Sequence, residues 1–138
     1  MNASTRTVGL VAAGGAVGAG ARYALVTQIP VRAGSFPTTT LLINVAGAFA
    51  LGLLVETVVK HDRHAAWARP LLGIGLVGAF TTFSSMATEA VLLLRDAHAA
   101  TAAAYLLATI ALGIPSAAGG LLIGGWRPFQ PVPDEGES

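Results

Sequence analysis

The chain has 138 residues, of which 54% are hydrophobic and 11% are charged, and its mean hydropathy is +0.67. A soluble domain carries about 25% charged residues, so this composition indicates a protein that lies in a membrane. Eight basic and seven acidic side chains nearly cancel, and the scattered basic residues exclude the electrostatic footprint of a nucleic-acid-binding protein. The absence of cysteine excludes a disulfide framework, a thiolate nucleophile and a zinc–thiolate site.

Four apolar segments are long enough to cross a bilayer, whose hydrocarbon core of about 30 Å requires roughly 20 residues of helix. These segments cover residues 8–28, 39–59, 71–94 and 99–125. The breaks between them are short, so we expect neighbouring helices to be antiparallel. The sequence therefore predicts an all-α membrane protein with one four-helix domain over residues 1–127. Residues 128–138 are rich in proline and acidic side chains, and we expect them to form a disordered tail.

The first segment also has features of a signal peptide, because Arg6 precedes the apolar run and Gly20 and Ala21 offer small residues near a cleavage point. Its length favours a membrane span, since the apolar part of a signal peptide is about 7–15 residues long. With four spans, the basic residues of the loops divide unequally between the two sides of the membrane. Arg32 and Arg95 fall on one side, and on the other lie Arg6, Lys60, Arg63, Arg69 and Arg127. This bias is modest, so the orientation is only weakly specified.

Pairs of small residues four positions apart recur along the predicted helices. They are Gly14 and Gly18, Ala48 and Gly52, and Gly120 and Gly124. Such pairs let helix backbones approach closely in lipid, where packing and hydrogen bonds drive association. Four helices are few to surround a polar pathway, so we expect a pathway where two copies meet and predict a dimer. The alternative is that an alanine- and glycine-rich composition scatters small residues along the chain.

The third segment carries three glycines followed by four hydroxyl residues, namely Gly73, Gly75, Gly78, Thr81, Thr82, Ser84 and Ser85. Each glycine lowers helix stability by about 1 kcal/mol relative to alanine, and hydroxyls satisfy backbone groups that an unwound segment releases. We therefore predict that the third helix is broken near mid-membrane. At such a break, free carbonyls can coordinate a cation and amides can attract an anion. The alternative is an unbroken helix whose glycines serve packing.

Polar and ionisable side chains within the spans need partners. The amide of Asn44 requires a hydrogen bond in hydrocarbon, and an interhelical bond and a functional site explain it equally well. Arg22 and Glu56 lie near span ends and are expected to extend toward the membrane surface. Glu89 lies deeper, so it should pair with a basic group or hydrogen-bond across an interface, and a proton-coupled role is an alternative.

Aromatic and histidine residues carry weaker signals. Phe80, Phe83 and Met86 are spaced by three, as ordinary core or lipid-facing residues are, although the positive edge of an aromatic ring can also approach an anion. His61 and His64 are spaced as metal ligands can be, but no third ligand is evident.

Three segments carry a more specific pattern. Residues 14–23 read GGAVGAGARY, residues 37–49 read PTTTLLINVAGAF, and residues 78–86 read GAFTTFSSM. Together, in this order and on four spans, they resemble the CrcB or Fluc family of fluoride channels. The first is similar to the family's glycine-rich start that ends in Arg-Tyr, the second to its Gly-Thr-Leu-x-x-Asn-x-x-Gly-x-Phe pattern, and the third to its Thr-Thr-Phe-Ser-x-Phe helix break.

The resemblance implies a passive channel, not an enzyme, that exports cytoplasmic fluoride through a bacterial inner membrane. It further implies an antiparallel dimer inserted in both orientations, with two pores and a structural sodium ion at its centre. By position, the resemblance assigns the fluoride pore to Asn44, Phe83, Met86, Tyr105, Thr109, Thr82 and Ser85. It assigns the sodium ion to backbone carbonyls of Gly78 and Thr81, and supporting roles to Arg22, Thr40 and Glu89.

Departures from the family pattern leave alternatives open. Met86 stands where the family usually has a second pore phenylalanine, Thr39 replaces a glycine, and Gly113 replaces a common serine. Because the missing ring edge weakens anion contact at one position, a heterodimer with a related subunit is one alternative. A small proton-coupled multidrug exporter is another, with Glu56 or Glu89 as its membrane-embedded carboxylate. A packing subunit of a larger membrane complex is the third.

Overall fold

The computed structural model describes residues 2–59 and 66–125. Within these residues the chain forms helices and no strands, in the order α1 (Ala3–Gln28), α2 (Thr38–Leu54), η1 (Val55–Val59), η2 (Arg69–Val77), α4 (Gly78–Phe80), α5 (Phe83–Arg95) and α6 (Ala99–Ile123). The predicted tail at residues 128–138 and the histidines at positions 61 and 64 lie outside the described residues.

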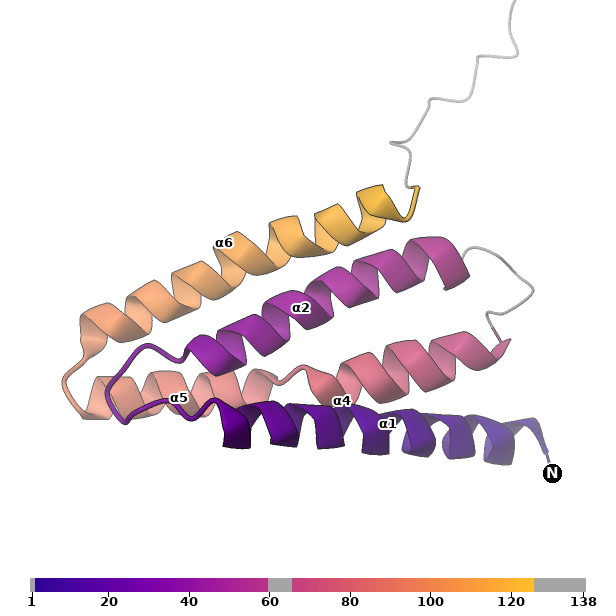
Figure 1. Cartoon of the computed structure of the whole chain (residues 1–138), viewed down its shortest axis with the longest axis horizontal. Coiled ribbons are helices and arrows are strands. Elements are labelled where there is room, and N and C mark those ends of the chain that lie inside the picture. Colours follow the sequence, from indigo (N-terminus) through magenta and orange to yellow (C-terminus); the bar gives the residue numbers. More distant parts are fainter. Residues whose placement is uncertain (1, 60–65, 126–138) are drawn as a thin grey trace, which may run out of the picture.

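Four helical stretches of the described chain are long and apolar enough to cross a membrane: Ala3–Gln28, Thr38–Val58, Ala66–Arg95 and Ala99–Ile123. The predicted all-helical architecture with four spans is confirmed. The third stretch begins at Ala66, earlier than expected, because hydropathy marks only the apolar part of a helix that continues into polar sequence. Successive stretches run in opposite directions along one bundle (Figure 1).

Helix α1 packs closely against η2 through small residues. A Cβ atom on Gly14 would overlap the carbonyl oxygen of Leu71, and one on Gly18 would overlap that of Leu76. A Cβ on Gly75 would lie 2.7 Å from the carbonyl oxygen of Val11, closer than real Cβ contacts. The glycines of both helices therefore allow backbone-to-backbone contact, as expected where dispersion drives helix association.

Helices α2 and α6 also pack closely at glycines. A Cβ on Gly52 would overlap the carbonyl oxygen of Ala117, and one on Gly120 would overlap that of Phe49. The small residues from which the sequence predicted a dimer thus pack helices within a single chain. A dimer has to be argued from other features of the molecule.

The third span departs from regular α-helix in two places. Its first part, η2, is a nine-residue π-helix, a rare and wider coil that is frequently found at functional sites. The sequence carried no signal for it. After α4, Thr81 has ψ 157° and Thr82 has φ −150° and ψ 114°, both extended, before α5 begins at Phe83. Figure 1 shows the uncoiled ribbon between α4 and α5.

The buried core lies where α2, α5 and α6 meet. Leu41, Ala90 and Tyr105 form its centre, and the Tyr105 side chain is fully buried. The Phe36 ring meets the Tyr105 ring edge-on, with centroids 5.6 Å apart and an interplanar angle of 80°, a favourable geometry for two aromatic rings. This cluster holds α5 and α6 in place beside the uncoiled segment.

Candidate functional site

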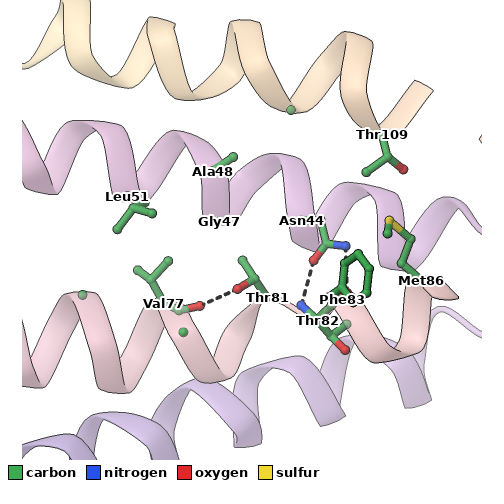
Figure 2. Close-up of a pocket in the computed structure, with 13 residues that line it drawn as sticks. Asn44, Gly47, Ala48, Leu51, Val77, Thr81, Thr82, Phe83, Met86 and Thr109 are labelled. Carbon is green, nitrogen blue, oxygen red and sulfur yellow. Dashed lines mark hydrogen bonds between the residues drawn. The ribbon is translucent and has the colours of Figure 1, made fainter. Parts of the chain in front are cut away.

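A pocket of about 430 Å³ opens beside the uncoiled segment, between α2, the third span and α6 (Figure 2). It is lined by Asn44, Gly47, Ala48, Leu51, Gly73, Val77, Gly78, Thr81, Thr82, Phe83, Met86, Thr109 and Gly113. Most of its wall is apolar, and its polar groups gather near the two extended residues. We call it the site pocket.

Asn44 of α2 holds the uncoiled segment through two hydrogen bonds (Figure 2). Its Nδ2 donates to the carbonyl oxygen of Thr82 at 3.0 Å, and its Oδ1 accepts from the N–H of Thr82 at 2.8 Å. The side-chain amide thus satisfies both backbone groups of a residue that has left the helix. An amide NH₂ has two donors, so one N–H of Asn44 remains for another acceptor.

The uncoiled segment redirects donors away from two carbonyls of the third span. In a continuous helix the N–H of Thr82 would bond the carbonyl of Gly78, but here it donates to Asn44. Likewise the N–H of Ser85 would bond the carbonyl of Thr81, but it donates to Oγ1 of Thr82 at 3.1 Å. Both carbonyls are thereby released from the helical hydrogen-bond ladder.

The hydroxyls after the break form a local network that starts α5. Besides accepting from the N–H of Ser85, Oγ1 of Thr82 lies 3.0 Å from Oγ of Ser85 and 3.3 Å from Oγ of Ser84. Thr82 is therefore the N-cap of α5, a position where threonine stabilises a helix start by about 1 kcal/mol. Its side chain is buried, whereas Ser85 is half-buried.

Phe83 and Met86 occupy different environments on α5. Both line the site pocket, but the Phe83 side chain is 78% exposed, while Met86 is half-buried and packs against the cluster around Tyr105. Thr109 also lines the site pocket, and its hydroxyl donates to the Tyr105 carbonyl of its own helix at 2.9 Å.

Glu89, Thr40 and Tyr105 form a second polar cluster outside the site pocket. The hydroxyl of Thr40 donates to Oε1 of Glu89 at 2.6 Å, and the hydroxyl of Tyr105 donates to Oε2 at 2.7 Å. Each carboxylate oxygen therefore has a donor from a different helix, as expected for an ionisable group at membrane depth. The sequence predicted that Glu89 pairs with a basic group or hydrogen-bonds across an interface, whereas in the structure two hydroxyls of the same chain donate to it.

Arg22 and Glu56 do not extend to the membrane surface as expected. Nη1 of Arg22 donates to the carbonyl oxygen of Thr81 at a long 3.4 Å, so this side chain turns inward to the uncoiled segment. Glu56 is only 7% exposed, because its stem packs against Gly124, where a Cβ would lie 2.7 Å from the Cβ of Glu56. The surface position predicted for Glu56 is wrong.

Gly47 is a site residue for which the sequence analysis gave no role. A Cβ on Gly47 would overlap Cγ2 of Thr81, so the absence of a side chain lets the uncoiled segment seat against α2. The signal was present, since Gly47 belongs to the motif that contains Asn44, but the close approach becomes visible only in three dimensions.

Among the described residues, no group of three or more histidine, aspartate or glutamate side chains is placed to hold a metal ion. The released carbonyls of Gly78 and Thr81 are oxygen ligands of the type that hard cations prefer.

The fold and the site together define a multi-pass helical membrane protein with a polar helix interruption that faces a pocket. The chain belongs to the CrcB family, because the family model described as "CrcB-like protein, Camphor Resistance (CrcB)" matches residues 9–121. This confirms the family resemblance seen in the sequence.

Relatives of the chain carry names that state a function. A protein of a Chelativorans species named fluoride-specific ion channel FluC is 41% identical over 85% of this chain and 91% of its own length. One of the same name from Agrobacterium fabrum is 37% identical over 85% of this chain and 94% of its own length. Fluoride-specific ion channel FluC 3 of Streptomyces avermitilis is 40% identical over 83% of this chain, but the match spans only 56% of that longer protein.

Proposed function

We propose that this protein is a fluoride-selective channel through which cytoplasmic fluoride leaves a bacterial cell passively across the cell membrane. Family membership and the names of the relatives support the substrate. The observation that carries the proposal is the double hydrogen bond between Asn44 and Thr82 at the wall of the site pocket.

Fluoride is small and strongly hydrated, so a pore has to replace its water with donors and still let it leave. The second N–H of Asn44 supplies one donor, and the hydroxyls around Thr82 supply others. The exposed ring of Phe83 offers a positive edge that attracts an anion without a formal charge. Thr109 adds a polar group on α6 at the wall of the site pocket, whereas the Tyr105 hydroxyl lies outside it and donates to Glu89.

We further propose an antiparallel dual-topology dimer with two pores, in which the break lies near mid-membrane. Irregular backbone at that depth is tolerated only where protein or water covers it, and one chain leaves Phe83 78% exposed beside the break. A second copy is the natural cover for this face. The weak charge asymmetry between the loops is compatible with insertion in both orientations.

The same dimer would provide a sodium site at its centre. One chain offers the released carbonyls of Gly78 and Thr81, and a two-fold partner would add the same pair. Sodium bound there would neutralise the partial negative charge of carbonyls that have lost their helical donors. Arg22 also contacts the Thr81 carbonyl, at 3.4 Å. A hydrogen bond of this length is weak, so sodium could compete with Arg22 for this carbonyl.

Two rival functions make different predictions. A proton-coupled exporter needs a carboxylate that can exchange a proton for a cation, but both oxygens of Glu89 accept hydrogen bonds from Thr40 and Tyr105. This disfavours Glu89, one of the two candidate carboxylates, as the group that exchanges a proton. A heterodimer is favoured by one feature only, the thioether of Met86 in place of an aromatic ring.

The test is fluoride efflux from liposomes that contain the purified protein alone, recorded with a fluoride-selective electrode after addition of a potassium ionophore. We expect rapid fluoride release and retained chloride. Release no faster than from empty vesicles would reject a homodimeric channel. Recovery of efflux only when a related subunit is co-purified would instead support the heterodimer. Cation uptake driven by a pH gradient, without fluoride release, would favour the exporter.

A further inference from the structure

Two cavities adjoin one another along the groove between α2 and η2. The site pocket and a second cavity of about 360 Å³ share Leu51 and Gly73 in their walls. The rest of the second cavity is lined by Leu54, Val55, Arg69 and Ile74. Because α2 ends at Leu54 and η2 begins at Arg69, this cavity lies toward the ends of the helices. The groove therefore leads from the helix ends to the break.

Arg69 is the one charged side chain among the described residues that line these two cavities. An arginine guanidinium carries a positive charge that is delocalised over its planar fork. The acidic residue of the facing segment, Glu56, is buried with its stem against α6. The other charged group near the break, Arg22, approaches Thr81 from α1 and is also cationic. The described lining of the groove thus carries one positive charge, at its outer end.

The walls around Arg69 are aliphatic or glycine, and this decides how an anion would be held there. Walls of low dielectric focus the field of a charge into the groove and raise the local concentration of counter-ions. Their side chains offer no hydrogen bonds, so an anion would keep much of its water and be held by the Arg69 guanidinium alone. Such weak binding suits an entry site, which has to capture and release.

We propose that Arg69 forms an anion-capture site at the mouth of the groove, where a small hydrated anion gathers before it moves to the break. This inference rests on the proposed fluoride channel and adds a residue that sets how fast the pore fills. A unit charge about 8 Å from an ion in water contributes a factor of about two in local concentration, and more beside an apolar wall.

The experiment compares initial fluoride efflux of the full-length protein and Arg69 variants in liposomes, at low fluoride, under two ionic strengths. At about 10 mM, where the Debye length is about 30 Å, we expect Arg69→Gln to lower the rate about two- to fourfold and Arg69→Glu to lower it further. At about 1 M, where the Debye length is about 3 Å, the variants should match the wild type within about 1.5-fold. Arg69→Lys should retain the wild-type rate at both ionic strengths.

Arg6→Gln is the matched control, because Arg6 is exposed near the start of α1 at the same end of the bundle.

The outcomes separate the inference from the function on which it rests. If the wild type releases fluoride but Arg69→Gln is no slower than Arg6→Gln at low ionic strength, the capture site is rejected and the channel stands. If the wild type itself fails to release fluoride, the proposed function fails. An effect of Arg69→Gln that appears only in vesicles of anionic phospholipid, and not in zwitterionic phosphatidylcholine, would assign Arg69 to the net negative charge of the lipid surface and also overturn the capture site.

Discussion

Asn44 and Thr82 pair as an amide does with a peptide, through one hydrogen bond in each direction, at 3.0 Å and 2.8 Å. The two residues belong to different spans, so α2 fixes the conformation of a segment that interrupts the third span. Without this pairing, the N–H of Thr82 would lose its acceptor, while the Thr82 carbonyl, at the N-cap of α5, would keep only the first bond of that helix.

Replacing Asn44 by alanine should therefore destabilise the folded chain. The change removes both hydrogen bonds and leaves the N–H and carbonyl of Thr82 without them, which we expect to cost about 1–3 kcal/mol. The measurement is the free energy of unfolding in mixed micelles of increasing SDS content. Thr57→Ala is the control, because the exposed Thr57 hydroxyl bonds the carbonyl of Leu53 in its own turn. Equal stability of the two variants would show that the pairing contributes nothing.

Gly47→Ala should displace the uncoiled segment, because the new Cβ would overlap Cγ2 of Thr81. Overpacking of this kind costs about 1–3 kcal/mol, and we expect fluoride efflux to fall with stability. Thr81→Ser removes the methyl group that collides, so the double variant should regain most of the lost stability and efflux. Both quantities are measured, by SDS unfolding and by the fluoride electrode.

The control for Gly47 is Gly20→Ala, since no atom lies within 4 Å of a Cβ at Gly20. It should change neither stability nor efflux measurably. A double variant no better than Gly47→Ala alone would contradict a steric origin and point to the backbone of α2 instead.

Tyr105→Phe should destabilise the chain because it removes the donor to Oε2 of Glu89. A hydrogen bond to a charged group contributes about 1.5–3 kcal/mol in water-soluble proteins and less within membranes, so we expect a loss of about 1–2 kcal/mol by SDS unfolding. Tyr23→Phe is the control, because Tyr23 is 73% exposed. In a double-mutant cycle with Thr40→Val, non-additivity above about 0.5 kcal/mol is expected, since both donors serve one carboxylate. Strict additivity would count against a shared network.

Met86→Phe tests the departure from the family pattern. If an aromatic edge stabilises the anion at this position, initial fluoride efflux should rise about two- to tenfold, corresponding to about 0.5–1.5 kcal/mol for an aromatic contact. Met86→Leu keeps the volume without the ring and should leave the rate unchanged. A rate for Met86→Phe equal to that of Met86→Leu would show that the position contributes little to conduction.

The sequence was sufficient for the spans. Of the predicted pore residues, Asn44, Thr82, Phe83, Met86 and Thr109 line the site pocket, whereas Tyr105 and Ser85 do not. Hydropathy locates a span because the length of an apolar helix is set by the bilayer, and the motif around Asn44 marks the helix that contacts the break. The sequence did not predict which residues are hydrogen-bonded to one another. Neither the bond from Asn44 to Thr82 nor the two bonds of Glu89 has a local pattern, because each joins residues more than ten positions apart.

Which helices each small residue brings together could also be seen only in the structure. Gly14 lies four residues before Gly18, and Gly120 lies four residues before Gly124, which is the spacing expected at any close helix contact. This spacing is the same for a contact within one chain and for a contact between two chains. Their would-be Cβ atoms overlap neighbouring backbone of the same chain. The burial of Glu56 and the π-helix of η2 were missed for a similar reason, since both depend on how α6 and α1 pack against these segments.

The role of the Asn44–Thr82 pair in conduction is tested most directly by fluoride efflux from liposomes that carry equal amounts of wild-type protein or Asn44→Ala, with dimer content checked in each sample. We predict that the wild type releases fluoride but not chloride, and that Asn44→Ala is at least about tenfold slower, equivalent to about 1.4 kcal/mol, while still dimeric. Equal fluoride efflux from the two proteins would contradict a conduction site at this break.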